Sequence, residues 1–242
     1  MDEQLRAAER VGDDERAARL RARAGVEPLA ARLTRVGEKL AGAAAAWRTR
    51  GGRPTGDPAA LREDLRWFGA EGPHGHDYRV APALDERELA RLEATLGITL
   101  PADFRAFLAH IASAGAGPSY GLLPASRWGE HLLHAERSLG ALSLPCLLDP
   151  QRAPAPLSRP TEASDEAEPP LPPGARDHFQ GTLALVSEGC GYYSALVLNG
   201  PGRGRVVCVS LEGTHHFAPE PDFLAWYEAW LDRVLAGEQA NA

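Results

Sequence analysis

Cysteine is scarce in this sequence, and long apolar runs are missing. Only three of the 242 residues are cysteine, and no two of them are close together, which argues against a disulfide framework and a cysteine-rich zinc site. No stretch approaches the ~20 consecutive apolar residues that cross a bilayer. The charged residues 1–10 also contain no apolar segment of the kind found in secretory signals. We therefore expect a cytoplasmic protein with no membrane partner.

Basic charge is scarce in most of the chain. Residues 1–68 contain 14 Lys/Arg and 11 Asp/Glu, a net charge of +3, whereas residues 69–242 contain 12 and 22, a net charge of −10. Direct binding to nucleic acid needs clustered basic side chains that neutralise phosphates, so we expect none. An acidic domain is better suited to a basic protein partner, which it attracts over a distance.

The first fifty residues are rich in alanine, arginine and glutamate, which are good helix formers. We predict a helical N-terminal extension over residues 1–60. Its longest apolar stripe, at alternating steps of three and four, consists of Leu33, Val36, Leu40, Ala43 and Trp47. This pattern fits a helical hairpin packed on its own domain, and it also fits a helix that dimerises or binds a partner.

Residues 61–242 form the predicted main domain, which begins with helices. Asp85 and Glu88 have the spacing of a reciprocal N-terminal cap, and Gly97 ends the helix that they begin. Pro101 starts the next helix. The apolar stripe of that helix consists of Phe104, Phe107, Leu108 and Ile111.

Strand-like runs follow these helices. We predict a short strand around 120–123 and three more over 181–186, 192–198 and 205–211, with a hairpin turn at 199–204. A closing helix carries one apolar face, made of Phe223, Trp226, Tyr227, Trp230, Leu231 and Val234. Helices first, clustered strands next and a helix last indicate an α+β fold. Residues 149–177, rich in proline and acidic residues, are expected to be a solvated insert.

Residues that could carry catalysis are few. Cys190 lies between two glycines, and His215 and His216 could supply a base for it. No helix follows that would activate this thiol, so we predict a small buried cysteine at a strand end. Two closely spaced histidine pairs lack the partners of a four-ligand metal site. The glycine-rich run 200–204 lies between two strands, which favours a turn over a phosphate loop. We predict no catalytic residue, no metal and no cofactor.

A series of motifs occurs in a fixed order along residues 66–235. The run 97–108, GITLPADFRAFL, and the run 115–122, GAGPSYGL, are followed by GTLAL at 181–185 and by DFLAWYEAWL at 222–231. Together they resemble the SUKH superfamily, the Smi/Knr-like proteins, whose motifs include "LP.DYR.FL" and "GGAGPYYGL". Residues 1–60 lie outside this resemblance.

The resemblance implies an α+β domain with a central, largely antiparallel sheet and flanking helices. It also implies a bacterial immunity protein of a polymorphic toxin system, which is not an enzyme and which binds and neutralises a cognate toxin. The acidic charge of the main domain suits a toxin with a basic nuclease domain. The alternative is a general protein-interaction or scaffold module of the same fold, as in the regulation of cell-wall synthesis.

We place the partner-binding site at loop and strand ends, because aromatic residues at loop exits are common binding anchors. The predicted residues are Tyr120, Glu188, Tyr192 and Tyr193. An alternative is that Tyr120 and Tyr192 are half-buried and close the core. Because side chains alternate along a strand, Tyr192 and Tyr193 should point to opposite faces.

Overall fold

The computed structural model describes residues 27–50, 76–135, 137–151, 177–211 and 213–237. The helices are α3 (Leu29–Thr49), α5 (Glu86–Leu96), α6 (Ala102–His110), α7 (Glu130–His134) and α8 (Phe223–Leu235), with the short 3₁₀ helices η3 (Ala125–Arg127), η4 (Leu139–Ser143) and η5 (Asp177–Phe179). The strands are β1 (Thr182–Gly189), β2 (Tyr192–Val197), β3 (Val206–Ser210) and β4 (His215–Phe217). The predicted α+β class is confirmed.

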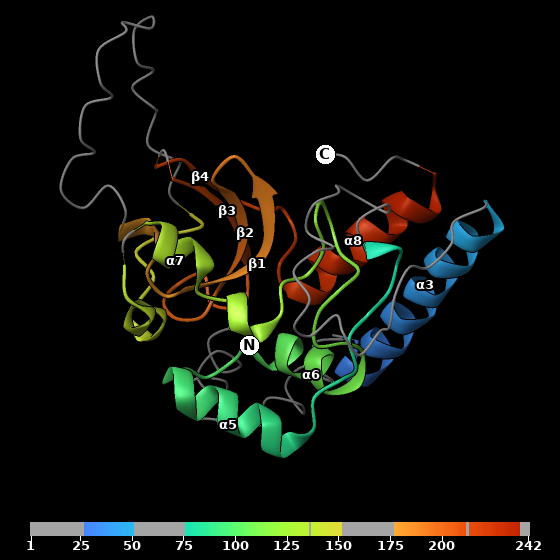
Figure 1. The fold of residues 1–242 in the computed structure, drawn as a ribbon, viewed down its shortest axis with the longest axis horizontal. Helices are drawn as coiled ribbons and strands as arrows, with labels where there is room; N and C mark the ends of the chain where they lie inside the picture. The colour runs from blue at the N-terminus through green and yellow to red at the C-terminus, as the bar shows by residue number, and fades with distance from the viewer. Residues whose placement is uncertain (1–26, 51–75, 136, 152–176, 212, 238–242) are drawn as a thin grey trace, which may run out of the picture.

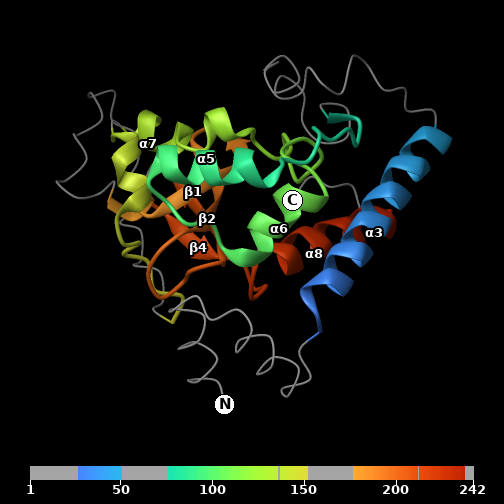
Figure 2. The same cartoon turned by 90° about the horizontal axis from the view of Figure 1, so that it is seen from below.

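The four strands form one antiparallel sheet in the order β1-β2-β3-β4. The sheet and α7 make one end of the molecule, and α3, α6 and α8 make the other (Figure 1). Figure 2 shows the same division from below, with α5 in front of the sheet. Strand β4 was not predicted, because a three-residue strand leaves too short a pattern. The strand predicted at 120–123 is reduced to an isolated bridge between Gly115 and Leu122.

Helices α5 and α6 begin and end close to where the sequence predicts. At the start of α5, the Glu88 amide donates to Asp85 Oδ1 at 2.8 Å, and the Asp85 amide donates to Glu88 Oε2 at 2.9 Å. Gly97 ends the helix with a φ of 63°, in the left-handed region that glycine favours. Helix α6 buries Phe104, Phe107 and Leu108, as its stripe predicts.

Aromatic rings connect α6 to α8. The ring centroids of Phe104 and Phe223 are 4.7 Å apart, and those of Phe107 and Tyr227 are 4.9 Å apart, both in edge-to-face geometry. The Tyr227 hydroxyl donates to the Ala116 carbonyl at 2.8 Å, so this buried polar group is satisfied. Burial raises the pKa of Tyr227. This cluster anchors α8 in the core.

Helix α3 packs along α8, as Figure 1 and Figure 2 both show. Four of the five residues in its predicted stripe are buried, and Trp47 is partly buried against them. The buried side chains of α3 belong to the same apolar cluster as the sheet and α8. Helix α3 is therefore part of the core. Residues 1–26 and 51–60 of the predicted extension lie outside the described residues.

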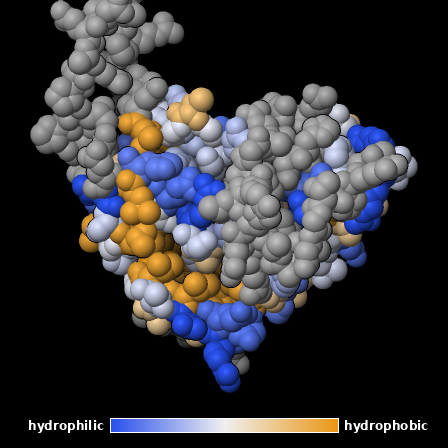
Figure 3. Space-filling model, viewed as in Figure 1, coloured by the Kyte–Doolittle hydropathy of each residue, from blue (hydrophilic) through white to orange (hydrophobic). Residues whose placement is uncertain are grey.

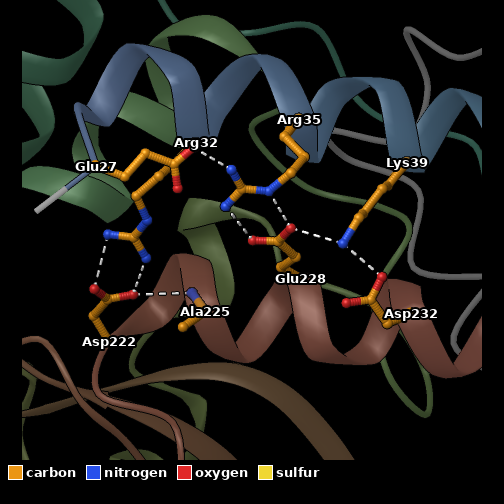
Figure 4. A network of polar contacts seen from close by, with 8 residues as sticks. All are labelled: Glu27, Arg32, Arg35, Lys39, Asp222, Ala225, Glu228 and Asp232. Atoms are coloured by element: carbon orange, nitrogen blue, oxygen red, sulfur yellow. Dashed lines mark hydrogen bonds and ion pairs between the residues drawn. The ribbon is translucent and has the colours of Figure 1, made fainter.

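Charged side chains line the edge of this helix pair (Figure 4). Arg32 donates two hydrogen bonds to the Asp222 carboxylate, at 2.5 and 2.9 Å. Arg35 donates to both oxygens of Glu228, at 2.5 and 2.9 Å. Lys39 lies 2.7 Å from Glu228 and 2.6 Å from Asp232. The hydrogen bonds from Arg35 lower the pKa of Glu228 to about 2, so this carboxylate is ionised at neutral pH.

The loop at Gly115 has no room for a side chain. Gly115 has a φ of 115°, and a Cβ there would lie 2.4 Å from the Arg79 carbonyl oxygen and 2.8 Å from the Val80 Cα. Gly97 has a φ of 63°, but a Cβ there would meet nothing within 4 Å. A side chain would be strained at both positions by the positive φ, but only at Gly115 would it also clash with neighbouring backbone.

Replacing these glycines with alanine should have unequal effects. We expect Gly115→Ala to lower the free energy of unfolding by about 3 kcal/mol, because a backbone neighbour cannot move aside easily. Gly97→Ala should cost about 1 kcal/mol, because only the left-handed backbone conformation opposes it. Urea unfolding followed by far-ultraviolet circular dichroism measures both values. Equal losses would show that the close contact at Gly115 relaxes.

Candidate functional site

Three of the four predicted site residues lie around the tip of the β1–β2 hairpin. Tyr120, Glu188 and Tyr192 are each partly buried. The Glu188 carboxylate accepts a hydrogen bond from the Ser119 hydroxyl and another from the Ser194 hydroxyl, the latter at 2.7 Å. Glu188 thus connects the loop that carries Tyr120 to the end of the sheet. The hairpin tip is therefore an ordered surface, and its Glu188 carboxylate is hydrogen-bonded within the protein.

Tyr193 lies in the core and not on this surface. Only 2% of the residue is exposed, and its hydroxyl contacts His134 Nδ1 and lies 3.4 Å from the Glu130 carboxylate. Burial, with Glu130 as the next cause, raises the pKa of Tyr193. Tyr193 therefore fixes α7 on the sheet, and the exposed part of the predicted site reduces to Tyr120, Glu188 and Tyr192.

Glu188 should stabilise the hairpin tip. We expect Glu188→Ala to lower the free energy of unfolding by about 1–2 kcal/mol, because it removes the acceptor of two hydroxyl hydrogen bonds. Amide hydrogen exchange in residues 117–121 should become faster. Glu220→Ala, which removes a partly buried carboxylate from the loop before α8, should leave exchange in 117–121 unchanged. Equal exchange in the two variants would contradict a connecting role for Glu188.

Cys190 lies at the turn between β1 and β2, and it is exposed. The predicted buried position is wrong, because the chain reverses through Gly189 and Gly191, both with a φ of 80°, and Cys190 projects from the turn. His215 and His216 pair with Val209 and Cys208 in the sheet register, not with the hairpin tip. In the part of the chain that the structure describes, no group of three or more His, Cys, Asp or Glu side chains could hold a metal ion.

A second candidate surface, which the sequence analysis missed, lies over α7 and the segment after it. Four leucines are 44–62% exposed there, although large apolar side chains are otherwise mostly buried in the described residues. They are Leu133, Leu139, Leu144 and Leu147, called here the leucine surface. Figure 3 shows apolar side chains gathering on this side of the molecule. The largest apolar patch on a soluble protein is often a functional site.

Two leucine doublets are the signal that could have indicated this surface. Leu132 is fully buried and Leu133 is 59% exposed, whereas Leu148 is 6% exposed and Leu147 is 62% exposed. Neighbouring residues of a short helix or an extended segment point in different directions, so both leucines of a doublet cannot face one core. The sequence does not show which of the two is outside.

A protein-family model matches more than half of the chain. The model of the SMI1 / KNR4 family (SUKH-1) matches residues 83–229. The chain belongs to the SMI1/KNR4 family. No curated protein and no solved structure matches it.

The SUKH match includes the hairpin tip and the leucine surface but not α3. The matched residues include the sheet, the helices α5 to α7 and the first half of α8, whereas α3 lies outside them. Within the described residues, no helix is long and apolar enough to cross a membrane.

Proposed function

We propose that this SUKH-domain chain is a non-enzymatic immunity protein that binds a cognate bacterial toxin in the cytoplasm and blocks its activity. The observation that carries the proposal is the leucine surface on a domain of this family. Four exposed leucines on a packed scaffold provide the apolar centre that protein interfaces use. The excess of acidic residues in 69–242 favours a basic toxin domain, such as a nuclease.

The test begins with the tagged full chain, captured from lysate of the cell that encodes it. Proteins that copurify in equal amount are identified by mass spectrometry. Each is then expressed in a bacterial host alone and together with this chain. The proposal predicts one stoichiometric partner that stops growth when expressed alone and is harmless when this chain is present.

Two results would contradict the proposal. Several partners at low stoichiometry, none of them toxic, would favour the scaffold module. A toxic partner whose effect persists despite equimolar binding would show an interaction that does not neutralise it. Salt dependence then separates the partner classes, because a complex held by charge with a basic nuclease weakens as ionic strength rises.

A further inference from the structure

The leucine surface is held rigidly by contacts beneath it. The side chain of Asn199 donates to the carbonyls of Leu142 and Leu144, at 3.2 and 3.3 Å. Gly181 packs so closely that a Cβ there would lie 2.4 Å from the Leu144 carbonyl oxygen. Under α7, His131 Nε2 lies 2.9 Å from Thr182 Oγ1 of the sheet. The surface is therefore ordered before any partner arrives, which reduces the entropy lost on binding.

The part of this surface that α7 and η4 form does not present a sheet edge. In α7 the Leu133 amide donates to Gly129, and in η4 the Ala141 amide donates to Ser138. The Cys146 amide donates to Asn199. An extended segment that binds by strand pairing needs free amides and carbonyls in a row. Over α7 and η4, a partner must therefore satisfy its own backbone hydrogen bonds, which a helix does.

The size of the surface also fits one helix. The four leucines together expose about as much area as two whole leucine residues, on the order of a few hundred Å². A permanent homodimer buries about 1,000 Å² or more on each partner and has a more apolar core. An amphipathic helix presents a narrow apolar stripe. The leucine surface is too small for a second copy of this chain, and it matches the stripe of a single helix.

Charge contributes little to recognition here. Residues 125–151 contain two arginines and three acidic residues, a net charge of −1. Arg127 and Glu130 pair with each other. Recognition at the leucine surface is therefore apolar, and its affinity should change little with salt.

We infer that the leucine surface binds the apolar face of one amphipathic helix of the partner protein. This inference rests on the proposed function for the identity of the partner, the toxin. The preference of the surface for an apolar helix does not depend on the proposed function. Two experiments separate these parts.

The first experiment needs no toxin. A displayed library of amphipathic helices of about 16 residues, with apolar side chains on one face, is selected against the full chain. Selected peptides should lose binding by at least about 30-fold to a Leu133→Asp, Leu147→Asp double variant, which removes half of the leucine surface. Leu235→Asp is the matched control, because Leu235 of α8 is 44% exposed, as are Leu139 and Leu144. The control should bind within threefold of wild type.

The second experiment uses the captured toxin with the same variants, and their folding is checked by urea unfolding. If the double variant unfolds, Leu147→Ser replaces it. We expect the toxin to lose at least about 100-fold in affinity with the double variant. A toxin that binds both variants as it binds wild type would overturn the inference and leave the proposed function intact.

Two further outcomes are decisive. If the selected peptides bind through the leucine surface but no captured protein is toxic, the binding chemistry is supported and the proposed function is contradicted. A dimer in sedimentation equilibrium that Leu147→Asp converts to a monomer would show that a second copy occupies the surface, and would overturn the inference.

Discussion

Between pH 7 and pH 5 the folded protein should lose about 3 kcal/mol of stability, chiefly because two histidines are buried in the neutral form. Burial lowers the pKa of His131 to about 3 and that of His76 to about 4. The unfolded chain binds protons at these sites below about pH 6.5, whereas the folded chain does not. Stability is therefore complete above pH 6.5 and is lost as the pH falls.

The surroundings of both rings explain why the neutral form persists. No hydrogen-bond partner of His131 Nδ1 is found among the described residues, and the ring lies against Phe179 and Tyr193. His76 Nδ1 accepts from the Tyr78 amide at 3.0 Å, and its ring lies edge-on to Trp230. Positive charge nearby, on Arg79 for His76 and on His178 for His131, further opposes an imidazolium in either place and lowers both pKa values. At pH 5 each site contributes about 2 kcal/mol to the loss.

Asp103 acts in the opposite direction. Burial, with the nearby Asp222 as the next cause, raises the pKa of Asp103 to about 6. The folded chain therefore holds a proton here that the unfolded chain releases above about pH 4. This group stabilises the fold as the pH falls, and it offsets about 1 kcal/mol of the histidine effect at pH 5.

Three variants test this account by urea unfolding at pH 7 and pH 5. In His131→Leu the loss between the two pH values should shrink by about 2 kcal/mol. In Asp103→Asn the loss should grow by about 1 kcal/mol, because the offset is removed. His110→Gln, at an exposed position of α6, is the control and should leave the loss unchanged. An unchanged loss in His131→Leu would show that buried histidine is not the cause.

Most elements of the fold could be predicted from short-range patterns in the sequence. The reciprocal cap of Asp85 and Glu88 is present as predicted, since capping depends on residues three apart. The stripes of α3, α6 and α8 follow the core because helical period is visible in sequence. Strand β4 was missed because pairing with β3 defines it, and that pairing is not a local property.

The candidate sites were less predictable for the same reason. Strand alternation placed Tyr192 and Tyr193 on opposite faces, but it could not show that Tyr193 is the buried one. That outcome depends on α7, whose His134 and Glu130 meet the Tyr193 hydroxyl from another part of the chain. The exposure of Leu133 and Leu147 likewise follows from tertiary packing.

Replacing Ala43 with aspartate should destabilise the whole domain by more than about 4 kcal/mol, because an unpaired charge would be buried. Ala43 of α3 is fully buried and belongs to the cluster that includes the sheet. Ala45 is exposed on the same helix, so Ala45→Asp makes the same chemical change two residues away. This control should cost less than about 1 kcal/mol. Urea unfolding by circular dichroism measures both.

Amide hydrogen exchange in β2 separates two roles for α3. If α3 is part of the core, Ala43→Asp should accelerate exchange in β2 strongly, although the substitution is in a different element, because the helix and the sheet then unfold together. If α3 only docks on a domain that is stable without it, exchange should accelerate in α3 and α8 while β2 stays protected. The shared apolar cluster and the pairing of Arg32 with Asp222 favour the first result. That result would mean that this SUKH domain needs a helix that begins more than fifty residues before the matched range.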